Sequence, residues 1–166
     1  MNRFFERFAR WAVCLLLCVL WLGVPGAGAH AAEVVDDRGQ TVRFDRPATR
    51  VVSLLPSLTE TVCVLGACNR LVAVDRYSDW PAQVQRLPKA GGGLDPNVEM
   101  IVALRPDVVL VSDATRVSER LSALGIKVLA FNTKTYADVQ RVLQRVAVVL
   151  GVPQQQADVT WQGIRR

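Results

Sequence analysis

Histidine is nearly absent from this sequence, because the 166 residues contain only His30. A zinc or iron site of the usual kind needs several clustered ligands, so no resident metal is expected. The G-x-S-x-G pattern of serine hydrolases is missing as well, and His30 lies beside the predicted end of a leader, where it activates no cysteine. These absences argue against an enzyme and against a bound cofactor.

Runs of basic residues are also missing. The chain has 20 lysines and arginines against 15 acidic residues, but they are dispersed, and aromatic residues make up only 7%. A nucleic-acid-binding surface would show clustered basic residues interleaved with aromatic ones. Nucleic acid is therefore excluded as a partner, and the hydrophobic content of 51% excludes a long disordered chain.

The first recognisable feature is a leader over residues 1–31. Three arginines in the first ten residues precede an uncharged stretch over residues 11–24, and two overlapping Ala-x-Ala sites follow between residues 27 and 31. This order is typical of a secretory signal peptide and predicts a mature chain beginning near Ala32. The stretch is shorter than the ~20 apolar residues of a membrane-spanning helix, and an uncleaved anchor is the alternative. Cleavage removes three arginines and one glutamate, which lowers the net charge from +5 to +3.

Two cysteines, Cys63 and Cys68, remain in the mature part. In an exported protein such a pair is expected to form a disulfide. The bond would join the end of a helix, terminated near Gly66, to the segment that follows. Two small buried thiols are the alternative.

The mature chain alternates short apolar strands with helices. Residues 33–45 predict a hairpin around Asp37 and Gly39, and the S-L-T-E spacing predicts a capping box that starts a helix at Ser57. Strands are expected at 50–55, 71–74, 107–111 and 127–131, and helices at 57–66, 97–104, 117–124, 136–150 and from 154, with a helical turn at 81–87. This alternation predicts an α/β fold, a Rossmann-like parallel sheet flanked by helices.

Ligand sites of parallel sheets lie in the loops after the carboxyl ends of the strands. Here those loops are 56–59, 75–80 and 112–116, with 91–95 near the same rim. In the second loop, Tyr77 and Trp80 offer rings with polar tips that suit a flat or amphipathic ligand, although either ring could instead pack inside. The three glycines at 91–93 lack the spacing of a phosphate-binding loop.

Several stretches, in this order, resemble one family: the hairpin followed by RVVSLLPSLTE, then LGACNRLVAVDRYSDWP, NVEMIVALRPDVVLVS and ERLSALGIKVLAFNTKTYADVQRVLQRVAVVLG. They resemble the periplasmic substrate-binding proteins of ABC importers for cobalamin, iron-siderophores and haem, in which one rigid helix joins two lobes. DRYSDWP and the NVE helix are most similar to the cobalamin-binding members. Three glycines stand where those members can carry a tryptophan, so haem and siderophores stay open as ligands.

The resemblance implies a periplasmic protein that binds cobalamin or an iron chelate and hands it to a membrane permease. In that family an acidic residue docks onto the permease, and the corresponding residue here is Glu99. The helix dipole also explains an acidic residue at this position, because Glu99 stands in the first turn of a predicted helix. The implied ligand-binding residues are Tyr77, Trp80, Pro56, Ser57, Ser112 and Asp113.

The expected organisation is a signal peptide over 1–31, an N-terminal α/β lobe over 32–152, and the truncated start of the interlobe helix over 153–166. The family's second lobe is expected to be absent from this chain. Two other interpretations are open at this point: a remnant lobe that no longer serves transport, and a small exported enzyme of flavodoxin-like appearance.

Overall fold

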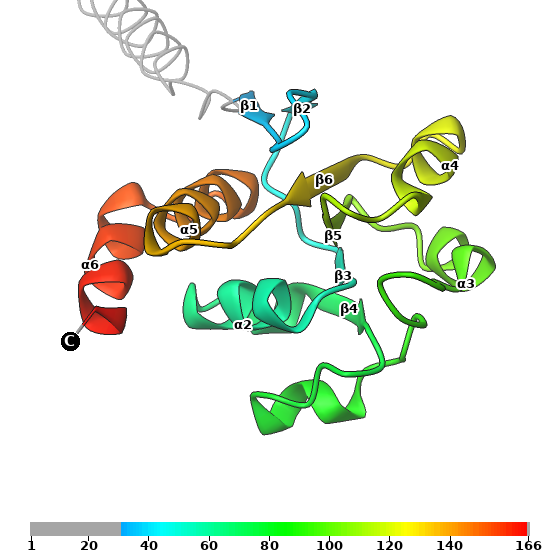
Figure 1. Ribbon diagram of the computed structural model, residues 1–166, viewed down its shortest axis with the longest axis horizontal. Helices are drawn as coiled ribbons and strands as arrows, with labels where there is room; N and C mark the ends of the chain where they lie inside the picture. Colours follow the sequence, from blue (N-terminus) through cyan, green and yellow to red (C-terminus); the bar gives the residue numbers. More distant parts are fainter. Residues whose placement is uncertain (1–30, 166) are drawn as a thin grey trace, which may run out of the picture.

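The computed structural model describes residues 31–165, which form a parallel sheet with helices on both faces (Figure 1). The strand order in the sheet is β4–β3–β5–β6, and every neighbouring pair is parallel. The strands are β3 (Val51–Ser53), β4 (Leu71–Val74), β5 (Val108–Ser112) and β6 (Val128–Phe131). The expected fold class is confirmed.

The helices are placed as the alternating pattern predicts. They are α2 (Pro56–Val64), α3 (Val98–Ala103), α4 (Val117–Ala123), α5 (Tyr136–Leu150) and α6 (Gln154–Ile164), with short 3₁₀ turns η1 (Cys68–Arg70) and η2 (Ala82–Arg86). No helix within residues 31–165 is long and apolar enough to cross a membrane.

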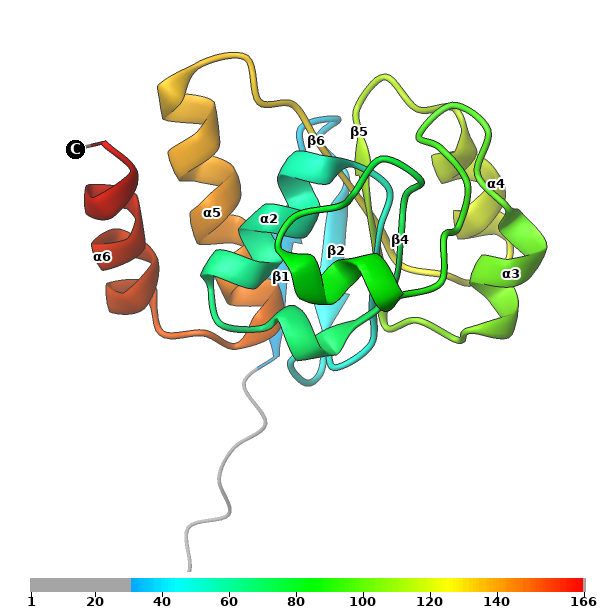
Figure 2. The same cartoon turned by 90° about the horizontal axis from the view of Figure 1, so that it is seen from below.

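Alternate residues of β3, β5 and β6 pack into two separate hydrophobic cores. On β3, Val51 packs in the core with α2, α5 and α6, whereas Val52 packs in the core with α3 and α4. Side chains of a strand point to opposite faces in turn, so a strand buried on both faces needs apolar residues at every position. Figure 2 shows the two groups of helices on either side of the sheet.

The capping box predicted at Ser57 is wrong. Helix α2 begins one residue earlier, at Pro56, with Leu55 as the N-cap residue and no side-chain cap. Proline suits the first helical position because its φ is already helical and its missing N–H has no partner there. A capping box is present at α5 instead, where Thr135 and Asp138 each accept a hydrogen bond from the other's backbone N–H.

The hairpin of β1 (Ala32–Val35) and β2 (Thr41–Phe44) closes the β6 edge of the sheet. The N–H of Asp37 donates to the carbonyl of Ala130 at 2.9 Å, and the N–H of Ala130 donates to Oδ2 of Asp36 at 3.2 Å. Covering an edge strand in this way removes a template for pairing with another chain.

The end of α2 carries the expected disulfide between Cys63 and Cys68. Gly66, between them, has φ +77°, a left-handed conformation that ends the helix without strain in glycine. The bond therefore joins the last turn of α2 to η1, directly before β4.

Helix α6 lies beside α5 and buries Ala157 and Trp161 in the core (Figure 1). The side-chain amide of Gln156 in α6 donates a hydrogen bond to the carbonyl of Leu65 at the end of α2. That α6 is the start of an interlobe helix stays a prediction.

Candidate ligand-binding rim

A hollow of about 310 Å³ lies at the carboxyl ends of β3, β4 and β5. All three loops expected at the rim contribute to it, together with the glycine loop. It is lined by Leu54, Leu55, Pro56, Asp75, Tyr77, Gly92, Gly93, Leu94, Asp95, Ser112, Ala114 and Thr115. Pro56, Tyr77 and Ser112 of the expected ligand-binding set thus line one concave surface.

The two aromatic residues of the loop after β4 project outwards. Tyr77 is 68% exposed and Trp80 66%, so neither ring packs inside. Leu94, which also lines the hollow, is 89% exposed. Exposed apolar groups gathered at a concave site are typical of a surface that is covered by a ligand or partner.

The loop carrying these rings is fixed by Asp75, which is fully buried. Its carboxylate accepts the N–H of Tyr77 at 2.8 Å and the hydroxyl of Ser78 at 2.5 Å. An aspartate that binds the backbone two residues later forms an Asx turn. The D-R-Y-S spacing after an apolar strand carries that signal, although Asp75 was not among the predicted site residues.

The glycine loop is a tightly folded turn. Gly91 has φ +90°, and a Cβ there would lie 2.6 Å from the carbonyl oxygen of Asp95. The hydroxyl of Thr115 donates to the carbonyl of Gly93, and Arg76 pairs with Asp95 at 2.5 Å. These glycines let the backbone fold tightly against the rim.

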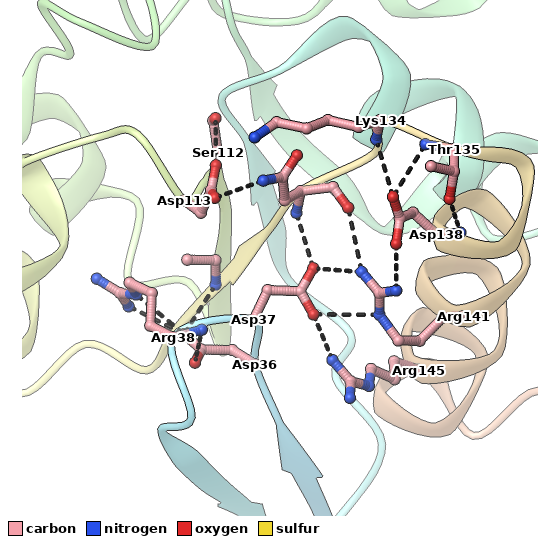
Figure 3. Close-up of polar contacts among 12 residues, drawn as sticks. Asp36, Asp37, Arg38, Ser112, Asp113, Lys134, Thr135, Asp138, Arg141 and Arg145 are labelled. Atoms are coloured by element: carbon pink, nitrogen blue, oxygen red, sulfur yellow. Dashed lines mark hydrogen bonds and ion pairs between the residues drawn. The ribbon is translucent and has the colours of Figure 1, made fainter.

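Polar residues of the rim lie in the loops directly after β5 and β6. Asp113 is partly buried and accepts a hydrogen bond from the Asn132 side chain at 2.7 Å (Figure 3). Asn132 in turn donates its backbone N–H to Asp37 of the hairpin. The hairpin therefore supports the rim through Asn132, a residue that no motif in the sequence singles out.

Asp37 is the centre of a cluster with Asp138, Arg141 and Arg145, which we call the Asp37 cluster (Figure 3). Arg141 reaches Asp37 at 2.8 Å, and Arg145 reaches it at 2.6 Å. Burial by itself raises the pKa of Asp37, but the hydrogen bonds from Arg141 and the amide of Asn132, with the charges of both arginines, hold it below the usual 3.8. Hydrogen bonds from Arg141 and Thr135 lower the pKa of Asp138 to about 2.

Several of the expected functional residues lie outside the lining of the hollow. Trp80 and Asp113 stand on loops that border it. Ser57 lines a second groove of about 460 Å³ between α2 and α5, whose other residues are largely apolar. Glu99 is exposed in the first turn of α3, after the N-cap Asn97, and within residues 31–165 no cation lies within 4.0 Å of its carboxylate.

Comparison with known proteins identifies the class that this fold and rim define. Residues 51–161 match the family described as periplasmic binding protein, and the chain belongs to that family. This is a family of binding proteins, which agrees with the expectation that the chain is not an enzyme.

The relatives include proteins that bind vitamin B12 and proteins that bind haem. A vitamin B12-binding protein of Photorhabdus laumondii is 33% identical over 109 residues, which cover 64% of this chain and 40% of the relative. A periplasmic haem-binding protein of Pseudomonas aeruginosa is 30% identical with a TM-score of 0.67 over 71% of this chain and 43% of its own. A periplasmic vitamin B12-binding protein of Vibrio cholerae is 32% identical with a TM-score of 0.60 over 72% and 49%.

The chain thus spans less than half the length of each of these three relatives. This partial coverage fits the expected N-terminal lobe.

Proposed function

We propose that this chain is the N-terminal lobe of an exported solute-binding protein that binds cobalamin and presents it to the permease of an ABC importer. The observation that carries the proposal is the hollow at the carboxyl ends of the strands, bordered by the exposed Tyr77, Trp80 and Leu94. A large amphipathic ring system gains most from such a surface, because aromatic side chains bury much area in one contact.

Cobalamin is the first candidate because the DRYSDWP loop resembles that of cobalamin-binding proteins, and because a vitamin B12-binding relative reaches 33% identity. Haem is the second, because the haem-binding protein of Pseudomonas aeruginosa has the same fold at 30% identity. Residues 1–31 lie largely outside the described part of the chain, and export by a signal peptide there is part of the proposal.

The ligand proposal is tested with Tyr77→Ala and Trp80→Ala. Equilibrium dialysis against cobalamin, haem and a ferric siderophore gives the dissociation constant of each. Because each ring supplies a large contact area, we expect each substitution to weaken binding of the true ligand about tenfold. Tyr136→Ala is the control, since Tyr136 is 76% exposed on α5. Unchanged affinity in both rim variants contradicts the proposed ligand site. If the wild-type chain binds haem alone, haem replaces cobalamin as the proposed ligand.

The docking proposal is tested with Glu99→Arg. Reversing this charge on an exposed first turn should leave ligand affinity intact and abolish uptake, because a basic patch on the permease would now be repelled. Glu119→Arg is the matched control, since Glu119 is the acidic residue in the first turn of α4. Uptake of radiolabelled ligand in cells is the measurement, and normal uptake with Glu99→Arg refutes the docking role.

A further inference from the structure

Four buried polar side chains form a continuous chain beneath the rim. Ser53, Thr59 and Asp75 are fully buried, and Ser78 is 1% exposed. The hydroxyls of Ser53 and Thr59 lie 2.9 Å apart, those of Thr59 and Ser78 lie 2.8 Å apart, and Ser78 reaches Asp75 at 2.5 Å.

The chemistry of the groups sets the direction of these hydrogen bonds. The hydroxyl of Ser78 donates to Oδ2 of Asp75. The hydroxyl of Ser53 donates to the carbonyl of Leu55. Both serine oxygens are then acceptors for the single hydroxyl proton of Thr59, whose oxygen lies 2.9 Å from Ser53, 2.8 Å from Ser78 and 3.3 Å from the carbonyl of Leu55. Thr59 therefore donates to one of these oxygens at a time, and its hydroxyl is the group that contacts both ends of the chain.

The chain crosses from one rim loop to the other. Ser53 ends β3, two residues before the N-cap Leu55. Thr59 stands in the first turns of α2, and Asp75 and Ser78 flank Tyr77 in the loop after β4. These side chains thus join the start of α2 to the loop with the two exposed aromatic residues. Of the four, only Asp75 lines the hollow.

Apolar residues would fill the same volume at less cost, because a buried polar group destabilises the fold unless it is hydrogen-bonded. What the polar chain adds is direction, because the contact between Thr59 and Ser78, which crosses from one loop to the other, has good geometry only over a narrow range of placements of the two loops.

Resting on the proposed function, we propose that Asp75, Ser78 and Thr59 are positioning residues of the ligand site. They hold Tyr77 and Trp80 at a fixed distance and orientation from the start of α2, so that both loops meet the same ligand. The backbone bond from Tyr77 to Asp75 and the bond from Lys89 Nζ to the Ser78 carbonyl complete the support of the loop.

Fluorine NMR of protein labelled with 5-fluorotryptophan tests the positioning without any ligand. The sequence has four tryptophans, and Trp80→Phe assigns the Trp80 resonance. Thr59→Val and Ser78→Ala each remove one donor at nearly constant volume. We expect them to shift or broaden the Trp80 resonance while that of Trp161, buried on α6, stays in place. Thr59→Ser keeps the hydroxyl and should restore the wild-type resonance.

Thr160→Val is the matched control for the threonine substitution. Thr160 donates to the carbonyl four residues earlier in α6, but it has no contact with the rim. A Trp80 resonance that is identical in wild type, Thr59→Val and Ser78→Ala overturns the proposal. So does a change in all tryptophan resonances that Thr59→Ser fails to reverse, because it marks general unfolding.

The second measurement is cobalamin affinity by equilibrium dialysis. Loss of a buried hydrogen bond should weaken binding about five- to tenfold in Thr59→Val and Ser78→Ala, with recovery in Thr59→Ser. Unchanged affinity beside a shifted Trp80 resonance overturns the positioning role in binding. Wild-type protein that binds no cobalamin, haem or ferric siderophore removes the proposed function, while the NMR result still decides whether the chain of hydroxyls places the loop.

Discussion

Asp37 links three parts of the molecule through one carboxylate. It accepts hydrogen bonds from Arg141 and Arg145 of α5 and from the backbone of Asn132 after β6. Because its side chain is only 11% exposed, water replaces these partners poorly when one is lost. One carboxylate therefore ties the hairpin to α5 and to the segment after β6.

This dependence predicts acid sensitivity. The pKa of Asp37 lies below 3.8 because the hydrogen bond from Arg141, the Asn132 amide and the two arginine charges outweigh burial, and the pKa of Asp138 is about 2. A carboxyl whose pKa is lower in the folded state stabilises the fold above its unfolded pKa, and this contribution is lost as the pH falls through the folded pKa. We expect the free energy of unfolding to fall between about pH 4 and pH 2.

Asp37→Asn tests the origin of that loss. The substitution removes the charge, so it should lower the free energy of unfolding at pH 7 by about 1–3 kcal/mol and flatten its decline below pH 4. Urea unfolding from pH 7 to pH 2 is the measurement. Glu33→Gln, which alters an exposed cross-strand pair with Arg43, is the control and should change stability by less than about 1 kcal/mol. An equal effect of both substitutions contradicts the special role of Asp37.

At the scale of elements, the turn between α5 and α6 determines how the last helix meets the core. Gly151 ends α5 with φ +63°, and a Cβ there would lie 2.6 Å from Cγ of Pro47. Both the backbone conformation and the contact with the segment before β3 exclude a larger residue. The packing of Trp161 against the core follows from this turn.

Gly151→Ala should therefore lower the free energy of unfolding by about 1–3 kcal/mol, since it combines left-handed strain with a steric clash. Gly163→Ala is the matched control, because Gly163 lies in α6 with nothing within 4 Å of the added Cβ. Alanine there should be neutral or stabilise the protein by up to about 1 kcal/mol. Chemical denaturation of both variants is the measurement, and equal stability of the two would show that the turn is adaptable.

At the scale of the whole molecule, ligand binding should be visible as stability. A ligand that binds only the folded state raises the free energy of unfolding by about 2.7 kcal/mol at a concentration 100 times its dissociation constant. We expect the melting temperature, followed by circular dichroism, to rise with cobalamin concentration. Trp80→Ala should show the same rise only at correspondingly higher concentrations. A melting temperature that does not move at saturating cobalamin contradicts binding to the folded lobe.

The vitamin B12-binding relative extends well beyond the part that this chain matches. The chain covers 40% of the vitamin B12-binding relative from Photorhabdus laumondii, so its rim corresponds to one part of that protein. The dissociation constant measured for this chain therefore reports what the part of the relative that this chain matches contributes to binding.

Much of the fold follows from local patterns in the sequence. The bounds of α5 agree with its helical spacing over 136–150, and the four apolar strands lie within about one or two residues of their expected places. The predicted start of α2 is wrong because S-L-T-E matches a capping box, whereas the preceding Pro56 already has the backbone conformation of a first helical residue.

The elements of the candidate site were also partly predictable. Strand ends are visible in sequence, so the convergence of the loops at Pro56, Tyr77 and Ser112 could be expected from the sequence alone. Which side chains support those loops could not, because the partners are far apart along the chain: Asp37 meets Arg141, and Thr59 meets Ser78. Periodicity and turn signals depend on neighbours within a few residues of the chain, so the sequence by itself determines the family and the order of the elements. The buried contacts that hold the rim were decided only by the tertiary structure, because packing has to bring polar groups that are distant in the sequence together.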